Sequence, residues 1–401
     1  MSASEHAFVQ AILGDKSIAG LADRALPNAK DEDWRFSDTR ALYERRFDVQ
    51  APAPSNAVPA TLSDAGQSHL VTDNGFVVAS VASGFELTTL DKLPDVEAAA
   101  VKDVLGSIAK WDDAFALISA ELQRDVLCLV VPPKAVVEAP IHLSHWATGS
   151  NTTALRTVII AGRESQFTVV EDYRGQGEYL RLATTEVVVG PNANVKHVRV
   201  QEESTGAAHL LRSAVRLSAH SHYDSYTVSC GAQWARHDLL ASHEGEGAFC
   251  RIDGLVLASG HQVSDTHSAI DNTRPHCESH QLHKSIVGGK AHSIFNGKIL
   301  VQKGAQKIDA YQLNRSLLLS NTARVDTKPQ LEILADDVRC SHGATIGQLD
   351  DEQLFYLRSR GFDENGARGM LTYAFAGEIL EQIPVAELRN RLEAVAHAHT
   401  H

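Results

Sequence analysis

The densest group of potential metal ligands lies in the stretch THSAIDNTRPHCESHQLHKS, residues 266–285. Imidazole and thiolate groups are good ligands for zinc and iron. Alternate residues of an extended strand face the same way, so His276 and His280 could bind one ion, whereas Cys277 would face away. The spacing matches no closed zinc site, and we favour the alternative that these histidines line a solvated turn or a β coil. The ligand-type residues of the stretch are His267, His276, Cys277, His280 and His283.

A second candidate is the pair Cys340 and His342 in the segment LADDVRCSHGATIG. An extended strand would hold both side chains on one face, about 7 Å apart by the rise per residue. A neighbouring imidazole can help to deprotonate a thiol, which makes the sulfur a better nucleophile or metal ligand. The competing interpretation is a buried structural cysteine.

Signatures of nucleotide hydrolysis and of common hydrolases are absent from the sequence. It contains no G-x-x-x-x-G-K-[ST] phosphate loop, no G-x-G-x-x-G between a strand and a helix, no G-x-S-x-G serine elbow and no H-E-x-x-H zinc helix. We therefore predict that this chain is not an enzyme of these classes, and that any ATP hydrolysis takes place on another chain.

The elements that must position these residues begin with a predicted N-terminal helical region, 1–125. Within it, the proline-containing segment 49–66 predicts an extended connector. Short strand-like runs follow at 75–81 and 84–90, and residues 95–123 predict a helix that is interrupted near Lys110 and Trp111.

Residues 126–348 are predicted to form one long β region. Short runs of Val, Ile, Leu and Thr end at Gly, Asn or Asp, and apolar and polar residues alternate with a period of two over 215–220. Such a region could form β-sandwiches or a parallel β-helix. No linker divides it, which favours a solenoid, so we predict a mainly β protein with a parallel β-helix core.

Residues 349–401 are predicted to form a C-terminal helical domain. Asp363 is positioned to cap one helix, and Pro384 to open the last one. The capped helix carries an apolar stripe that would pack on its own domain or bind a partner. The residues of this stripe are Ala367, Met370, Leu371, Ala374, Phe375 and Ile379.

Composition indicates an acidic globular protein. Hydrophobic residues make up 43% of the chain, and 37 Lys and Arg against 50 Asp and Glu give a net charge of −13, which argues against disorder and against nucleic-acid binding. No apolar run approaches the roughly 18 residues of a membrane span, and the N-terminus shows no leader pattern, so we predict a cytoplasmic protein. Five scattered cysteines predict no disulfide framework, with Cys128, Cys230 and Cys250 in the core.

The segment 292–362, from HSIFNGKILVQKG to RCSHGATIGQLDDEQLFYLRSRGF, closely resembles the SufB/SufD family of iron–sulfur cluster assembly proteins, as does EDWRFSDTRAL at 32–42. The resemblance implies a right-handed parallel β-helix between two helical regions. Leu313 and Gly343 stand where the SufB branch has a cysteine and a glutamate, so the chain is more similar to the SufD branch.

The resemblance further implies a non-catalytic scaffold subunit that pairs with SufB, binds the SufC ATPase and helps iron acquisition and cluster assembly at the SufB–SufD interface. It places Cys340 and His342 near that interface as candidate iron or cluster ligands, and the SufC contact within about 350–385. Nucleotide-driven dimerisation of SufC would move the helical domains and open the interface. The candidate SufC-contact residues are Leu354, Phe355, Tyr356, Arg360, Met370, Leu371 and Phe375.

No tightly bound cofactor is implied. Iron or a cluster would be held transiently and shared with SufB, flavin could bind the complex, and the isolated chain could form a homodimer. Two other functions stay open: a β-helix enzyme acting on polysaccharides, and a stand-alone histidine-rich metal-binding protein. An aromatic content of only 6% and the lack of a leader argue against the first, and a tightly held stoichiometric metal would support the second.

Overall fold

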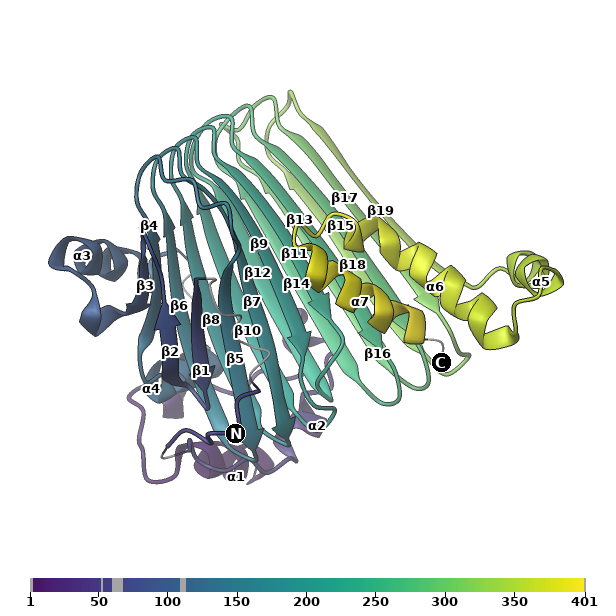
Figure 1. Ribbon diagram of the computed structural model, residues 1–401, viewed down its shortest axis with the longest axis horizontal. Helices are drawn as coiled ribbons and strands as arrows, with labels where there is room; N and C mark the ends of the chain where they lie inside the picture. The colour runs from purple at the N-terminus through teal and green to yellow at the C-terminus, as the bar shows by residue number, and fades with distance from the viewer. Residues whose placement is uncertain (1–2, 52, 60–67, 109–112, 400–401) are drawn as a thin grey trace.

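Short strands joined by tight corners wind the chain into a parallel β solenoid with helices at both ends (Figure 1). The computed structural model describes residues 3–51, 53–59, 68–108 and 113–399. Each coil of the solenoid contributes one strand to each of two sheets that face one another across the lumen. The predicted mainly β fold with a parallel β solenoid is confirmed.

In chain order, alternate strands join opposite sheets. The 10-stranded sheet contains β1 (His69–Asp73), β2 (Phe76–Val81), β5 (Ile141–Gly149), β7 (Gln166–Gly177), β9 (Asn194–Glu202), β11 (His222–Ser229), β13 (Phe249–Ala258), β15 (Glu278–Val287), β17 (Asp309–Leu318) and β19 (Arg339–Gln348). The 9-stranded sheet contains β3 (Glu86–Thr89), β4 (Val126–Val131), β6 (Thr152–Ala161), β8 (Leu180–Val189), β10 (Ala208–Leu217), β12 (Trp234–His243), β14 (Val263–Asn272), β16 (His292–Val301) and β18 (Arg324–Ile333).

Residues at the corners between the strands explain why the chain turns after each strand. Asn192 and Lys307 adopt left-handed backbone conformations with φ of 57° and 60°. Gly289 has a φ of 59°, and a β-carbon there would lie 2.8 Å from the backbone nitrogen of Gly260 in the preceding coil. At position 289, only glycine accommodates both the positive φ and the close stacking on the preceding coil.

In the part of the chain that the structure describes, seven α-helices lie outside the two sheets. They are α1 (Ala3–Leu13), α2 (Thr39–Tyr43), α3 (Asp95–Val104), α4 (Ala114–Leu122), α5 (Asp351–Ser359), α6 (Glu364–Leu380) and α7 (Ala386–Ala398). Short 3-10 helices span Leu21–Asp23, Glu32–Trp34 and Leu90–Lys92. Among the described residues, no helix is both long enough and apolar enough to cross a membrane.

The N-terminal region is less purely helical than predicted. The strand-like runs form β2 and β3, and β1 pairs in parallel with β5, so the sheets begin well before residue 126. The predicted helix over 95–123 is present as α3 and α4, and the break near Lys110 lies outside the described residues, as do 52 and 60–66 of the predicted connector.

Apolar side chains form separate clusters inside and outside the solenoid. The lumen holds the largest, which includes Leu129, Val187 and Ile299. Side chains of α1 and α4, such as Phe8 and Phe115, pack with Leu182 and Trp234 on the outer face of the 9-stranded sheet. Side chains of α6 and α7 pack on the outer face of the 10-stranded sheet, where they cover Val198, Tyr226, Leu255 and Ile286.

The face that α6 buries differs in part from the predicted stripe. Ala367 and Ile379 are buried as predicted, and Asp363 caps the helix by accepting a hydrogen bond from the Gly366 N–H. Met370 is exposed, however, because the buried face runs through Thr372 and Ala376 instead. One part of the predicted stripe, including Ala367 and Ile379, is therefore buried, and another part, including Met370, is exposed to solvent.

Candidate functional site

Cys340 and His342 lie on β19, the last strand of the 10-stranded sheet. In the parallel pairing with β17, Cys340 lies beside Ala310 and His342 lies beside Gln312. Ala310 and Gln312 are fully buried in the lumen, so the paired positions on β19 also face inward. Cys340 packs partly buried against the apolar core, whereas His342 is exposed where the lumen opens. We call this opening, at β18 and β19, the mouth of the lumen.

The electrostatic surroundings of Cys340 favour the neutral thiol. Burial raises the pKa of the Cys340 thiol, and the charge of Asp309 raises it further. A positive charge beside the sulfur would act in the opposite sense and favour the thiolate. The Cys340 thiol is therefore protonated near pH 7 in the isolated chain.

Strands β18 and β19 form the open end of the solenoid, since each is the terminal strand of its sheet. The N–H of Arg339 donates to the carbonyl of Ile308 in the preceding coil, so alternate residues of β19 direct their backbone groups to the free edge. Three large apolar side chains of the last coil, Ile333, Leu334 and Ile346, are exposed there. Free backbone edges with exposed apolar residues are typical of surfaces that pair with another chain.

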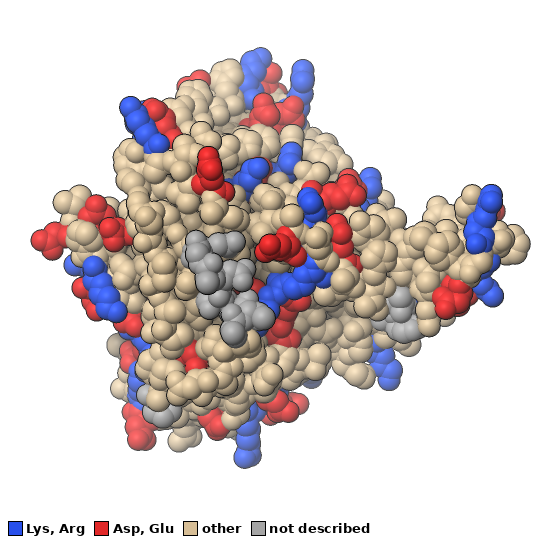
Figure 2. Space-filling model, viewed as in Figure 1, with Lys and Arg blue, Asp and Glu red and all other residues tan. Residues whose placement is uncertain are grey.

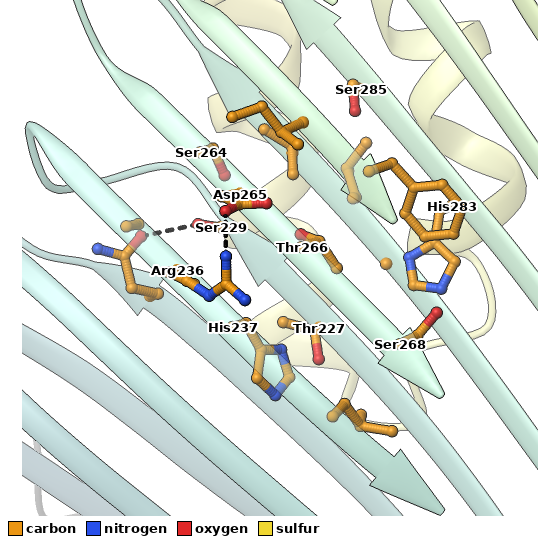
Figure 3. A pocket seen from close by; sticks show the side chains of 18 of the residues that line it. Thr227, Ser229, Arg236, His237, Ser264, Asp265, Thr266, Ser268, His283 and Ser285 are labelled. Carbon is orange, nitrogen blue, oxygen red and sulfur yellow. Dashed lines mark hydrogen bonds and ion pairs between the residues drawn. The ribbon is translucent and has the colours of Figure 1, made fainter. Parts of the chain in front are cut away.

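Deeper in the solenoid, the lumen contains a small cavity of about 40 Å³ (Figure 3). Its size is sufficient for two or three water molecules. Burial lowers the pKa of His283 to about 3 and that of His237 well below its ordinary value, so both imidazoles are neutral near pH 7. The labelled side chains around it are Thr227, Ser229, Arg236, His237, Ser264, Asp265, Thr266, Ser268, His283 and Ser285.

The histidines of the stretch 266–285 do not converge on one point. His276 lies in a corner with a φ of 59°, outside strand β15, so the predicted shared strand face with His280 is wrong. His280 contacts the ring of Phe249, with the ring centroids 5.5 Å apart, whereas His283 contacts Phe295 inside the lumen. His267 is paired with Asp265 at 3.0 Å. Among the described residues, no three His, Cys, Asp or Glu side chains are grouped to hold a metal ion.

Helices α5 and α6 form a second candidate site at the C-terminal end. Figure 1 shows α5 projecting from the body of the solenoid. A groove of about 640 Å³, the α5–α6 groove, lies between the two helices. It is lined by Tyr356 and Leu357 of α5 and by Met370, Leu371 and Ala374 of α6, with Asp350, Glu352 and Gln353 at its polar side.

Three of the seven predicted contact residues, Tyr356, Met370 and Leu371, line this groove. Phe355 is the most exposed large apolar side chain of α5, and the Arg360 guanidinium lies 5.2 Å from the centre of the Tyr356 ring. Leu354 is half-buried. Phe375 instead faces the sheet, where the Lys284 ammonium lies 4.6 Å from its ring centre, because the pitch of α6 turns this position toward β15.

Hydrogen bonds and ion pairs join helix α6 to the solenoid. The buried Lys284 Nζ donates to the carbonyl of Phe375 at 2.7 Å and pairs with Glu378 at 2.6 Å. In α7, Arg391 pairs with Glu202 at 3.0 Å. These contacts join the C-terminal helices to β9 and β15.

The lumen residue Gln312 was missed by reasoning from sequence. Its signal is the alternation of polar residues at 312, 314 and 316 in YQLNRS, which marks an inward polar face of a strand. Surface charge adds no further site on the face shown in Figure 2, where Lys and Arg are interspersed with Asp and Glu.

Comparison with known proteins yields one consistent family. Residues 145–375 match the family model described as SUF system FeS cluster assembly, SufBD core domain. The chain is 35% identical to an iron–sulfur cluster assembly SufBD family protein of Synechocystis, over 95% of this chain and 89% of the relative. It is 31% identical to the chloroplastic protein ABCI7 of Arabidopsis thaliana, over 94% and 83% of the two chains. It is also 31% identical to the iron–sulfur cluster assembly protein SufD of Escherichia coli, over 93% and 89%.

Proposed function

Since the chain belongs to the SufBD family of iron–sulfur cluster assembly proteins, we propose that it is a scaffold subunit of a SUF assembly complex. In this proposal it pairs with a SufB-type paralogue through the open end of its solenoid and binds the SufC ATPase through α5 and α6. Iron or a nascent cluster is cargo that Cys340 and His342 hold transiently, together with ligands from the paralogue.

The main observation that supports this proposal is that the solenoid ends in the unpaired edges of β18 and β19. A paralogue with the same solenoid cross-section could continue both sheets by pairing with β18 and β19. Pairing would cover Ile333, Leu334 and Ile346 and would close the mouth over Cys340 and His342. An iron site needs more than the two ligands of this strand pair, which supports a shared site at the interface.

The α5–α6 groove supports the second contact. The apolar part of its lining and the exposed Phe355 and Tyr356 fit a protein partner, since aromatic residues are enriched at interfaces. The sequence has no phosphate loop, so ATP hydrolysis belongs to that partner. The contacts of Lys284 with α6 would carry a movement of the helices to β15, two strands from the mouth.

The direct test is co-expression of this chain with SufB and SufC candidates, followed by affinity capture and measurement of dissociation constants. Capture of both partners is expected. A correctly folded chain that captures neither partner would overturn the proposal.

Ile346→Lys is expected to weaken SufB binding by about tenfold or more, because the charge would lose water at the paired edge. Ile346 is 48% exposed in the isolated chain, so the fold should tolerate lysine. Val136→Lys, at a residue that is 61% exposed and distant along the solenoid, is the matched control. Equal SufB affinity for both variants would contradict pairing at the open end.

Phe355→Ala is expected to weaken SufC binding by about 30-fold or more, the effect of removing a central aromatic residue from an interface. Binding of SufB should be unchanged. Phe355 is 74% exposed, and Val96→Ala on α3, at a residue that is 78% exposed, provides the control. If SufC binds Phe355→Ala as tightly as the unmodified chain, α5 is not its docking helix.

A further inference from the structure

The N-terminal segment of the chain returns to the last coil of the solenoid. Glu32 lies in the short 3-10 helix Glu32–Trp34, and its carboxylate accepts a hydrogen bond from Lys328 Nζ at 2.6 Å. Lys328 lies on β18, which is the terminal strand of its sheet. A segment from the start of the chain therefore forms part of the surface at the open end.

Aromatic stacking and a hydrogen bond hold this segment in place. The Trp34 ring stacks on the ring of Trp234, with a centroid distance of 6.3 Å and an interplanar angle of 4°. The Arg236 Cζ lies 3.8 Å from the centre of the Trp34 ring, and Arg236 Nη1 donates to the carbonyl of Asp33 at 2.8 Å. Because Trp34 and Arg236 are buried, the backbone of the segment is held against the sheet.

A pocket of about 360 Å³, which we call the 29–36 pocket, lies between this segment and β18. Lys30 and Arg35 line it and are exposed, and neither forms an ion pair with a described residue. The pocket therefore presents three cationic side chains and a single carboxylate, in a chain whose net charge is −13. The lining residues are Ala29, Lys30, Glu32, Arg35, Phe36 and Lys328.

The Glu32 carboxylate indicates that this pocket favours anions. Its pKa is lowered, chiefly by the hydrogen bond and charge of Lys328 and further by the charges of Lys298 and Arg35. Lys298 lies on the neighbouring strand β16, where it also pairs with Glu332 at 2.7 Å. Positive charges from two strands and from the N-terminal segment thus converge on one anionic group.

The position of Lys328 brings the pocket next to any strand that extends this sheet. Pro329 pairs with the lumen-facing Gly297, so Lys328 beside it faces outward. Directly opposite residues on paired strands have β-carbons about 5 Å apart. A strand that pairs with the free edge of β18 would therefore place one outward side chain directly beside Lys328.

We propose that the 29–36 pocket is a docking site for an acidic segment of the SufB-type paralogue, in which a carboxylate of the partner displaces Glu32 from Lys328. Lys30 and Arg35 bind further carboxylates of the same segment. This inference rests on the proposed function, in which the paralogue pairs with the open end. It adds the chemistry of the recognised segment and a contact outside the two sheets.

Charge and exposure favour a carboxylate of a protein partner. The side chain of Glu32 is 76% exposed and that of Lys328 is 30% exposed, so replacing Glu32 exposes no buried charge. Exposed ion pairs contribute little to stability, and exchanging one carboxylate for another therefore costs little. All lining residues are exposed or half-buried, so the pocket does not enclose a small free anion. Complementary charges at the rim of an interface chiefly set specificity and the rate of association.

The direct test is carbodiimide coupling, which joins an amine to a carboxylate that contacts it, followed by peptide mass spectrometry. In the isolated chain, Lys328 is expected to couple to Glu32. In the complex with the SufB candidate, Lys328 or Lys30 is expected to couple to an Asp or Glu of SufB, with loss of the internal product. An unchanged yield of the internal product, without coupling to SufB, would overturn the inference.

Two variants at the same ion pair are expected to change SufB affinity in opposite directions. Lys328→Glu should raise the dissociation constant about tenfold or more, because like charges would then meet at the pocket. Glu32→Gln should lower it about two- to fivefold, since it removes the competing carboxylate and keeps the shape of the side chain. Lys102→Glu on α3, at an exposed residue, changes the net charge as much as Lys328→Glu does and is the matched control.

The outcomes separate this inference from the proposed function. If both variants of the ion pair weaken SufB binding equally, the pair only supports the fold and the docking role fails. If Lys328→Glu binds SufB like Lys102→Glu, the pocket lies outside the contact. If inorganic phosphate competes with SufB more strongly than sodium chloride of equal ionic strength, the pocket binds a free anion instead. If the unmodified chain captures no SufB, the proposed function fails together with this inference. Thermal melting of each variant establishes that it is folded.

Discussion

Glu171→Ala is expected to lower the free energy of unfolding by about 3–5 kcal/mol, the cost of leaving a buried charge without its partner. Glu171 is fully buried in the lumen and accepts hydrogen bonds from Arg199 Nε at 2.9 Å and from Thr185 Oγ1 at 2.9 Å. Arg199 is also buried, and alanine would leave its guanidinium without an anion. Urea unfolding followed by circular dichroism measures the change.

The protonation states around Glu171 follow from its contacts. His197 Nδ1 lies 3.0 Å from Arg199 Nη2, which can only donate, so Nδ1 accepts and the proton lies on Nε2. That Nε2–H donates to Glu171 at 3.1 Å. Burial alone would raise the pKa of Glu171, but the neighbouring His197 and Arg199 hold it well below its usual range. The carboxylate is therefore ionised and its charge is balanced inside the lumen.

A compensating double variant and a surface control variant test the same prediction. Glu171→Leu combined with Arg199→Met should recover most of the lost stability, because an apolar pair of similar volume can replace a buried ion pair. Glu332→Ala removes a partly exposed ion pair with Lys298 and should cost no more than about 1 kcal/mol. A loss for Glu171→Ala as small as that of Glu332→Ala would show that the buried network contributes little.

Acidification from pH 7 to pH 4 is expected to destabilise the protein steeply. Burial lowers the pKa of His145 and His283 to about 3, and that of His197 and His243 to about 4. Their ordinary value is 6.5, so below that pH the unfolded chain binds protons that the folded chain does not. Each such histidine reduces stability by up to about 1.4 kcal/mol per pH unit until its folded pKa is reached.

Buried carboxylates also reduce the stability of the folded protein on acidification, but at a lower pH than the histidines do. Burial would raise the pKa of Glu203 and Asp265, but neighbouring cationic groups outweigh it and lower both to about 2. Their stabilisation is present above the ordinary carboxyl pKa and is lost as the pH falls through that range. Asp253 opposes this trend, because burial raises its pKa to about 7, and its folded form therefore gains protons before the unfolded form does.

Urea unfolding at pH 7, 5.5 and 4.5 measures this dependence. His283→Gln should make the loss of stability shallower by about one proton, whereas Asp253→Asn should make it steeper. A free energy of unfolding that stays constant between pH 7 and pH 4.5 would contradict neutral histidines in the folded lumen.

Several features could be predicted from sequence because they depend on neighbours in the chain. The alternation of apolar and polar residues at 215–220 reflects the two faces of one strand, and corner residues such as Asn192 act within a few positions. The helix cap at Asp363 is equally local, since its side chain bonds to Gly366 only three residues later. The placement of Cys340 and His342 on one strand could be predicted for the same reason, because the two residues are only two positions apart in the chain.

Contacts between coils could not be predicted in this way, because the length of the coils varies. Along one inward column the residues from Tyr223 to Cys250, Ser279, Ala310 and Cys340 are successive partners, at intervals that range from 27 to 31 positions. A shift of one residue moves every side chain to the other face. The sequence therefore could not show that Gln312 lies beside His342, or that His280 and His283 face opposite sides of a sheet.

By itself, the sequence determined the solenoid architecture, the helical ends and the family, since these depend on local periodicity, turn chemistry and a long specific motif. Only the tertiary structure decided which groups meet. It placed Gln312 beside His342, turned Phe375 toward Lys284 instead of the α5–α6 groove, and dispersed the histidines of residues 266–285. The physical reason is that the register between coils and the buried face of a helix are set by packing across the whole solenoid, which no short segment encodes.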